Sequence, residues 1–454
     1  MKSQRLNPLP ARTWIAAGIA AALACSASSG FAQTVTESEL ARKLDQLAAE
    51  LATVKAQLAQ IQQQQKQPQR AEAASAAAPM AAPVVEPANL ALAAPSSPAT
   101  VLTSYGEINY NRPTHATEKT QIDMRRFVLG YQHRFDEKTK VVAELEVEHA
   151  VASSGDPGEV AIEQAYIERQ FTPTWAARAG LFLMPVGLIN ENHEPTSFYG
   201  VERNFVETAI IPSTWREGGV QMVGTFDNGL TVQGGVASSF NLNKWDLGST
   251  DGKESPLGSI HQELALAKSH DLALFGAVNW RGIPGLLLGG SLFTGQATQA
   301  QTAVQSRITM WDLHARWTPG RWDFSTLYTR ANISNTAALN GALLSADALK
   351  KTPTVDPTLI PKSFDGYYVQ GAYKLWSHED YALTPFVRWE HFNTARAYAD
   401  LGPGLTPESG RGESVITLGA NFQVAQGVVL KTDYQRFRED RMRDRFNLGL
   451  GWSF

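Results

Sequence analysis

FNLGLGWSF, residues 446–454, alternates large apolar side chains with small or polar ones. Because successive side chains of a β-strand point to opposite faces, the apolar residues of this stretch would share one face. Other segments alternate in the same way but carry charges on the second face, as Glu144, Glu146 and Glu148 do in 141–148. An apolar face paired with a polar or charged face is typical of a strand in a transmembrane β-barrel, with lipid outside and water inside.

The composition is compatible with such a barrel. The chain has 454 residues, of which 19% are charged, and a formal net charge of −4. It contains no strongly basic stretch that would neutralise phosphates, so we do not expect nucleic acid as a partner. Beyond the first 25 residues there is no run of 18 apolar residues, which excludes a helical membrane protein.

Sixteen segments from residue 101 onward carry the alternating pattern. They begin near residues 101, 122, 139, 160, 174, 216, 229, 271, 284, 306, 320, 364, 381, 413, 427 and 443. Long connections follow the odd-numbered segments, and tight turns such as FDNG and TPGR follow the even-numbered ones, as in outer-membrane barrels. We therefore predict an all-β fold, a 16-stranded antiparallel transmembrane β-barrel over 101–454. The alternative, a soluble propeller, would require a repeated blade motif, and the sequence has none.

Three shorter segments are expected before the barrel. Residues 1–32 have the basic start, short apolar core and small residues of a secretory signal peptide; the alternative is a lipoprotein anchored at Cys25. Residues 33–67 predict a short periplasmic α-helical coiled coil; the alternative is an amphipathic helix that lies on the barrel. Residues 68–100 are rich in alanine and proline and predict an extended linker. The apolar heptad positions are Leu40, Leu44, Leu47, Leu51, Val54, Leu58 and Ile61.

Several stretches of the barrel segment resemble a known family. They are ARAGLFLMPVGLINENHEPTSFYGVERNFVE (177–207), IIPSTWREGGV (210–220), TPFVRWEHFNT (384–394), GVVLKTDYQR (427–436) and FNLGLGWSF (446–454). In order and spacing they are similar to the phosphate-selective porin O/P family of outer-membrane porins. The resemblance implies a homotrimer of sixteen-stranded diffusion channels, each narrowed by a third external loop that folds inward. It also implies an anion preference set by inward-facing arginines and lysines.

The third long connection, 188–215, is the expected inward-folded loop, and its charge differs from the family pattern. We expect its charged and titratable residues to form the pore constriction: Glu191, His193, Glu194, Glu202, Arg203 and Glu207. Four glutamates against one arginine give a net charge near −3, which would weaken any preference for phosphate. A metal site at Glu191, His193 and Glu194 is not expected, because three possible ligands on one loop are a weak signal.

The inward strand positions carry charges of both signs. The expected pore-wall residues are the basic ones: Arg126, Arg178, Arg316, Arg388 and Lys431. Acidic residues such as Glu144, Asp312 and Glu390 share the same inner faces. Two interpretations stay open. An acidic loop opposite a basic wall would create a transverse field that orients dipolar solutes, or the charges pair with one another and keep the lumen wet.

The predicted function is a passive porin channel for small hydrophilic solutes or ions, with anions such as phosphate as candidates. It would lie in the outer membrane of a Gram-negative bacterium, with outer-membrane lipid as a partner and the coiled coil in the periplasm. We expect no enzyme activity, no cofactor and no metal; an outer-membrane hydrolase is the enzyme alternative. Another alternative is a tether or adhesin whose coiled coil binds peptidoglycan while the barrel serves as anchor. The last strand ends in Phe454, which resembles the terminal aromatic residue that the barrel-assembly machinery recognises, so we expect this machinery as a partner.

Overall fold

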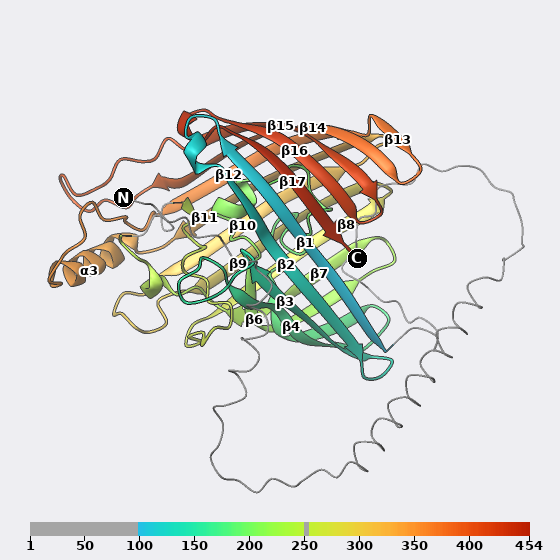
Figure 1. Cartoon of the computed structure of the whole chain (residues 1–454). Helices are drawn as coiled ribbons and strands as arrows, with labels where there is room; N and C mark the ends of the chain where they lie inside the picture. The colour runs from blue at the N-terminus through green and yellow to red at the C-terminus, as the bar shows by residue number, and fades with distance from the viewer. Residues whose placement is uncertain (1–98, 249–253) are drawn as a thin grey trace, which may run out of the picture. The chain divides into compact units, whose positions relative to one another are not determined.

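The computed structural model describes residues 99–248 and 254–454, which form a closed antiparallel β-barrel (Figure 1). The predicted signal peptide, the coiled coil and residues 68–98 of the linker lie outside the described residues. The predicted periplasmic position of the coiled coil and its predicted contact with peptidoglycan concern the same residues and stay predictions.

Sixteen strands form the wall of the barrel in the described part of the chain. In chain order they are β1 Thr100–Pro113, β2 Gln121–Arg134, β3 Thr139–Glu148, β4 Val160–Gln170, β5 Trp175–Leu183, β6 Arg216–Thr225, β7 Leu230–Ser238, β8 Leu272–Ile283, β9 Leu286–Gln296, β10 Arg307–Trp317, β11 Trp322–Ile333, β12 Ser363–Tyr373, β14 Tyr381–Ala397, β15 Glu413–Ala425, β16 Val428–Phe437 and β17 Arg445–Ser453. The three-residue β13, Trp376–His378, extends β12 along the same neighbour, since both pair with β14. The predicted sixteen-stranded antiparallel barrel is confirmed, and every predicted strand start lies within two residues of the observed one.

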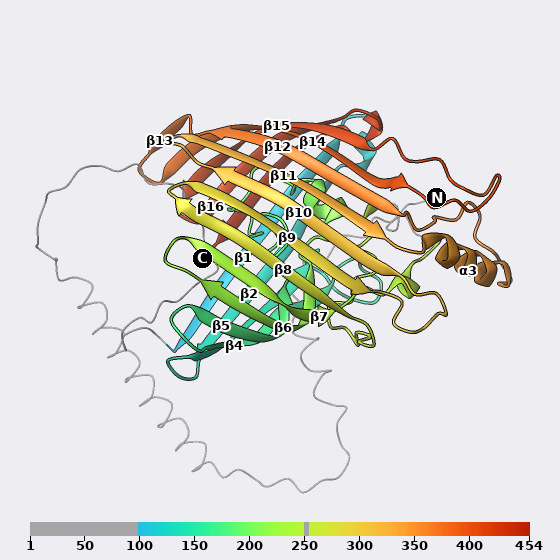
Figure 2. The ribbon, with the colours of Figure 1, turned by 180° about the vertical axis from the view of Figure 1, so that it is seen from behind.

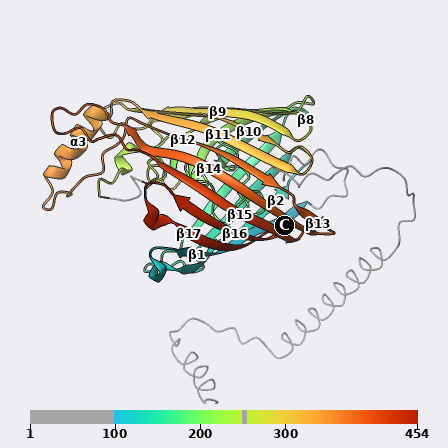
Figure 3. The same cartoon turned by 90° about the horizontal axis from the view of Figure 1, so that it is seen from above.

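Each wall strand pairs with its neighbours in the sequence, and β1 closes the barrel by pairing with β17 from Tyr105↔Ser453 to Pro113↔Arg445. Figure 1 shows blue β1 beside dark red β17, and Figure 2 shows β5 to β12 on the far side. Tight turns join the strands at one rim and long connections join them at the other. The longest helix of the described residues, α3 Thr336–Ala348, belongs to a long connection and lies beyond the ends of the strands (Figure 3).

Four short helical turns complete the described secondary structure: η1 Thr117–Lys119, η2 Val206–Ile210, η3 Leu242–Lys244 and η4 Arg441–Arg443. None of the helices in 99–248 and 254–454 combines the length and the hydrophobicity needed to span a bilayer.

The outer face of the wall is apolar. Leu418 and Leu448 are about half exposed, at 55% and 44%, although they lie in the middle of paired strands. Aromatic rings form two rows on this face across β10 to β14. One row lies towards the long connections and contains Trp311, Tyr328, Tyr367 and Trp389; the other lies towards the tight turns and contains Trp317, Trp322, Phe324 and Tyr373. On β10 the rows are six residues apart, roughly 20 Å along the strand, as expected for girdles at the two faces of a bilayer.

The inner face carries many polar and charged side chains beside apolar ones such as Phe182, Phe293 and Phe364. Buried side chains that point inward include Glu107, Arg126, Glu163, Gln221, Asp312, Asp365, Arg388, Glu390, Lys431 and Asp433. Burying such charges is costly unless they are paired. The partners therefore have to come from the wall itself or from chain that enters the lumen.

We predict that an arginine on the outer face destabilises the barrel. Leu418→Arg should lower the free energy of unfolding in lipid vesicles by about 2–4 kcal/mol, because the charge would sit among lipid chains. Urea titration followed by tryptophan fluorescence measures it. Leu405→Arg is the control, since Leu405 is similarly exposed, at 63%, but lies in the connection between β14 and β15. Equal stability of the two variants would contradict a lipid-facing wall.

Candidate functional site

The connection between β5 and β6, residues 184–215, folds into the barrel, and we call it the inner loop. Its apolar residues cannot face water, and Met184, Val206, Ile210 and Trp215 are fully buried. They belong to one hydrophobic cluster with residues of the wall and of the connection 239–271. Trp215, for example, lies 5.0 Å from Phe240 between ring centroids. Two long connections therefore fill part of the lumen, whereas the sequence predicted one.

Wall carboxylates hold the inner loop by its backbone. The N–H of Val201 donates to Asp433 of β16 at 2.6 Å, and the N–H of Phe205 donates to Glu390 of β14 at 2.6 Å. On the next part of the wall, the N–H of Gly187 donates to Asp312 of β10 at 3.2 Å. These bonds satisfy loop donors and wall acceptors at the same time, which removes the cost of leaving either buried and unpaired.

His193 fixes the other side of the inner loop. Its Nε2 forms an ion pair with buried Glu163 of β4 and lies 2.7 Å from the hydroxyl of Tyr105 of β1. Its Nδ1 lies 2.8 Å from the carbonyl oxygen of Asn190. Burial alone would lower the pKa of His193, but the carboxylate of Glu163 outweighs it and raises this pKa above its ordinary value. The ion pair therefore ties the loop to β4 while His193 is protonated.

Glu207 holds the inner loop together from within. Its carboxylate accepts hydrogen bonds from the N–H groups of Leu188 and Ile189 at 2.6 and 2.9 Å. It also accepts from the amide of Asn204 at 2.8 Å and from the hydroxyl of Tyr368 of β12 at 3.1 Å. Burial raises the pKa of Glu207. Glu207 therefore has a structural role, because its carboxylate joins three parts of the inner loop to one another and to β12.

The other predicted constriction residues occupy two kinds of position. Arg203 is buried, and its guanidinium donates to the hydroxyls of Ser213 and Thr214 at 2.7 and 2.8 Å. Glu191, Glu194 and Glu202 are half-buried. Glu191 accepts from Gln233 of β7 at 3.0 Å, and Glu202 accepts from Asn111 of β1 at 3.1 Å. Among the described residues, the carboxylate of Glu194 accepts a hydrogen bond only from the hydroxyl of Ser197, within the loop, at 3.2 Å.

The predicted pore-wall residues all lie on the inner face, and their arginines are paired. The guanidinium–carboxylate distances are 2.9 Å for Arg126–Glu107, 2.8 Å for Arg178–Glu168, 2.6 Å for Arg316–Asp323 and 3.0 Å for Arg388–Glu390. Lys431 places its Nζ 3.6 Å from the ring centroid of Phe198 in the inner loop. This pairing agrees with the interpretation in which lumen charges neutralise one another.

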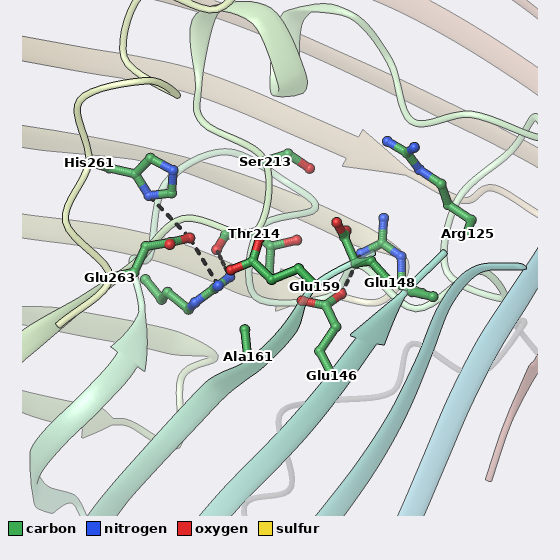
Figure 4. Close-up of a pocket in the computed structure, with 11 residues that line it drawn as sticks. Arg125, Glu146, Glu148, Glu159, Ala161, Ser213, Thr214, His261 and Glu263 are labelled. Carbon is green, nitrogen blue, oxygen red and sulfur yellow. Dashed lines mark hydrogen bonds and ion pairs between the residues drawn. The ribbon is translucent and has the colours of Figure 1, made fainter. Parts of the chain in front are cut away.

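A polar cavity of about 190 Å³ lies between the inner loop and strands β2 and β3. In the described residues, the inner loop makes no hydrogen bond to these two strands. The lining residues are Arg125 and Arg126 of β2, Glu146 and Glu148 of β3, Glu159 and Ala161 at the start of β4, Ser213 and Thr214 of the inner loop, Arg216 of β6, and His261 and Glu263 of the connection 239–271 (Figure 4). Of these, only Arg126 was among the predicted site residues. The apolar residues Phe240, Trp245 and Leu257 in a long connection were the signal that 239–271 also folds inward.

Comparison with known proteins supports the barrel fold. No family model matches this chain. An uncharacterized protein of Aquifex aeolicus is 28% identical over 355 residues, which cover 77% of this chain and 79% of that protein. Among solved structures, OmpF of Salmonella typhi in complex with daunomycin aligns with a TM-score of 0.53 and 12% identity over 78% of this chain and 97% of OmpF. The outer membrane channel DcaP of Acinetobacter baumannii aligns with a TM-score of 0.48 and 13% identity over 78% and 97% of the two chains. The chain thus shares the overall fold of OmpF, and membership of the phosphate-selective O/P family stays a prediction.

We predict that alkaline pH loosens the inner loop. Because the pKa of anchored His193 is raised, its ion pair stabilises the loop fully below the ordinary pKa of about 6.5 and is lost as pH rises through the raised value. Current fluctuations in a planar bilayer should therefore grow with pH in the wild type. In His193→Gln they should be large and independent of pH. Fluctuations that stay constant between about pH 6 and pH 9 in both proteins would contradict this role of His193.

Proposed function

We propose that the protein is a porin-type passive channel of the bacterial outer membrane for small hydrophilic solutes or ions. One observation carries the proposal: the barrel is apolar outside and carries many buried polar and charged side chains inside, and the inner loop narrows the lumen beside a polar cavity. Such an exterior suits lipid, and a narrowed aqueous lumen sets which solutes pass.

The path for solutes runs, in this proposal, along β2, β3 and the start of β4. The described inner loop is bonded to β1, β4, β6, β7, β10, β11, β12, β14, β15, β16 and β17. The open cavity is flanked by the stretch of wall that these bonds leave free. Half-buried Glu191, Glu194 and Glu202 supply negative charge nearby, so a strong preference for phosphate is not expected.

We further propose a homotrimer. Towards the long connections, outward aromatic rings occur on β10 to β14 but not on the described outer faces of β3 to β9, where Val236 and Gly276 are typical. Aromatic girdles occur where the wall contacts lipid headgroups. The sector β3 to β9 has no such rings towards the long connections, so we assign it to contact with other subunits. The heptads of 33–67 would add a second contact.

Phe454 fits a role in assembly. Its backbone exchanges hydrogen bonds with Ser104 of β1 at 2.9 and 3.0 Å, while its side chain is 78% exposed. The exposed ring contributes little to the packing of the finished barrel. It is therefore free to be recognised by the barrel-assembly machinery, which we propose as a partner.

We predict that the inner loop limits conductance. Replacing 191–207 by a Gly-Ser sequence of equal length removes the ion pair of His193, the buried side chain of Val206 and the hydrogen bonds that Glu207 accepts, so the loop should lose its place in the lumen and single-channel conductance should rise several-fold. The same replacement of 400–410, in an exposed connection, is the control and should leave conductance unchanged. Circular dichroism checks that both variants keep their β-structure. If the inner-loop variant conducts like the wild type, the loop does not narrow the path.

We predict that a bulky residue in the sector β3 to β9 disrupts the trimer. Gly276→Trp on β8 should produce monomers in detergent by light scattering, because the added ring would block close approach of a second wall. Gly371→Trp on β12 is the control in the sector with aromatic rings, and it should remain trimeric. An added Cβ meets nothing closer than 3.6 Å at Gly276 and 3.4 Å at Gly371, so neither change strains its own strand. Trimers of both variants would place the interface elsewhere.

A further inference from the structure

We infer that the polar cavity beside β3 is a binding site for small organic cations that carry a primary ammonium group. The inference rests on the proposed channel function and specifies the class of solute. It comes from the carboxylates of the cavity, which exceed what the neighbouring guanidiniums neutralise.

The strand pattern of β3 aligns three carboxylates. Glu144, Glu146 and Glu148 alternate along the strand and point into the lumen, with Cα atoms of successive members roughly 7 Å apart. Glu146 and Glu148 line the cavity. The pattern therefore lays an acidic ladder along the stretch of wall that the inner loop leaves free.

Glu159 places a further carboxylate directly beside this ladder. The N–H of Glu148 donates to the carbonyl oxygen of Glu159 at 2.9 Å, so the two residues are neighbours on adjacent strands, and both line the cavity. Like charges opposite each other destabilise a sheet. In the described residues neither carboxylate has a basic nitrogen within 4.0 Å. A bound cation between Glu148 and Glu159 would relieve the repulsion.

Glu146 supplies a second, independent indication of a ligand. Its side chain is buried, at 4% exposure, and its Oε1 lies 3.7 Å from Arg126, too far for a hydrogen bond. No other described atom donates to this oxygen. A buried acceptor without a donor costs free energy. A donor within the cavity would satisfy it, and an ammonium group has three N–H donors to share among Glu146, Glu148 and Glu159.

The remaining charges around the cavity leave the site acidic. Arg126 is held by Glu107 at 2.9 Å, and Arg216 is held by Glu263 at 2.9 Å. Arg125 is the third guanidinium of the lining, and His261 adds no charge near neutral pH because burial and Arg216 lower its pKa to about 4. With Glu107 included, and with the buried guanidinium of Arg203 that donates to Ser213 and Thr214, five carboxylates face four guanidiniums.

An organic cation fits the site better than a bare metal ion. No group of three or more histidine, cysteine or acidic side chains in the described residues has the arrangement of a metal site. The cavity volume of about 190 Å³ is several times the roughly 30 Å³ of one water molecule. It accommodates an ammonium group together with a short carbon chain.

The test measures butylammonium in two ways with the purified full-length protein. In planar bilayers at low salt, butylammonium should reduce wild-type current in a saturable manner, and in detergent micelles calorimetry should detect its binding. In the Glu148→Gln/Glu159→Gln double variant, the half-blocking concentration and the Kd should both rise about tenfold or more, since 1.4 kcal/mol corresponds to a factor of ten. Low salt is needed because salt screens these charges.

Glu408→Gln is the matched control, because Glu408 is exposed in the connection between β14 and β15 and lies outside the cavity lining. It should block and bind as the wild type does. Butylammonium binding that is equal in the wild type and the double variant would overturn the site, as would equal block by butanoate. Binding that depends on Glu148 and Glu159 in a protein without any channel current would support the site and overturn the channel function instead.

Discussion

Closure of the sheet is the constraint on which the rest of the structure depends. β1 pairs with β17, so every wall strand has a neighbour on both sides and the described wall has no free edge. A closed sheet gives each strand one outer and one inner face, which fixes the alternation of side chains along all sixteen strands. The outer residues can then meet lipid with no unpaired backbone group exposed. The inner residues become buried polar groups that must find partners in the lumen.

The inner loop supplies hydrogen-bond partners for several of these buried polar groups. Asp312, Glu390 and Asp433 point inward from three different parts of the wall, and each accepts a backbone N–H of the loop. Many wall charges are therefore part of the architecture that holds the loop, and do not simply act on passing ions. Beside β3 and the start of β4, the carboxylates of Glu146, Glu148 and Glu159 accept no hydrogen bond from the described part of the loop. A functional site in this barrel is thus found by asking which buried charges the structure leaves unpaired.

The sequence predicted the wall well because the wall depends on local pattern. Alternation of period two in 446–454, together with the regular exchange of tight turns and long connections, was sufficient for the strand number and the strand starts. The lumen depends on partners far apart in the chain, such as Glu163 with His193 and Tyr368 with Glu207. No local pattern predicts these pairs. The sequence identified the charges of 191–207 but could not show that His193, Arg203 and Glu207 are buried in structural contacts, nor that Arg125 and Glu159 line a cavity.

Chemical modification of one cysteine tests most directly whether solutes pass beside β3 and β4. Ala161 lines the cavity, and Ala161→Cys with Cys25→Ser leaves one thiol in the chain. A charged, water-soluble thiol reagent should reduce its single-channel current in steps. Thr417→Cys in the same background, at a fully buried inner position of β15, should be unaffected. An unchanged current after complete modification at position 161 would contradict the account, because solutes would then cross the barrel by another path.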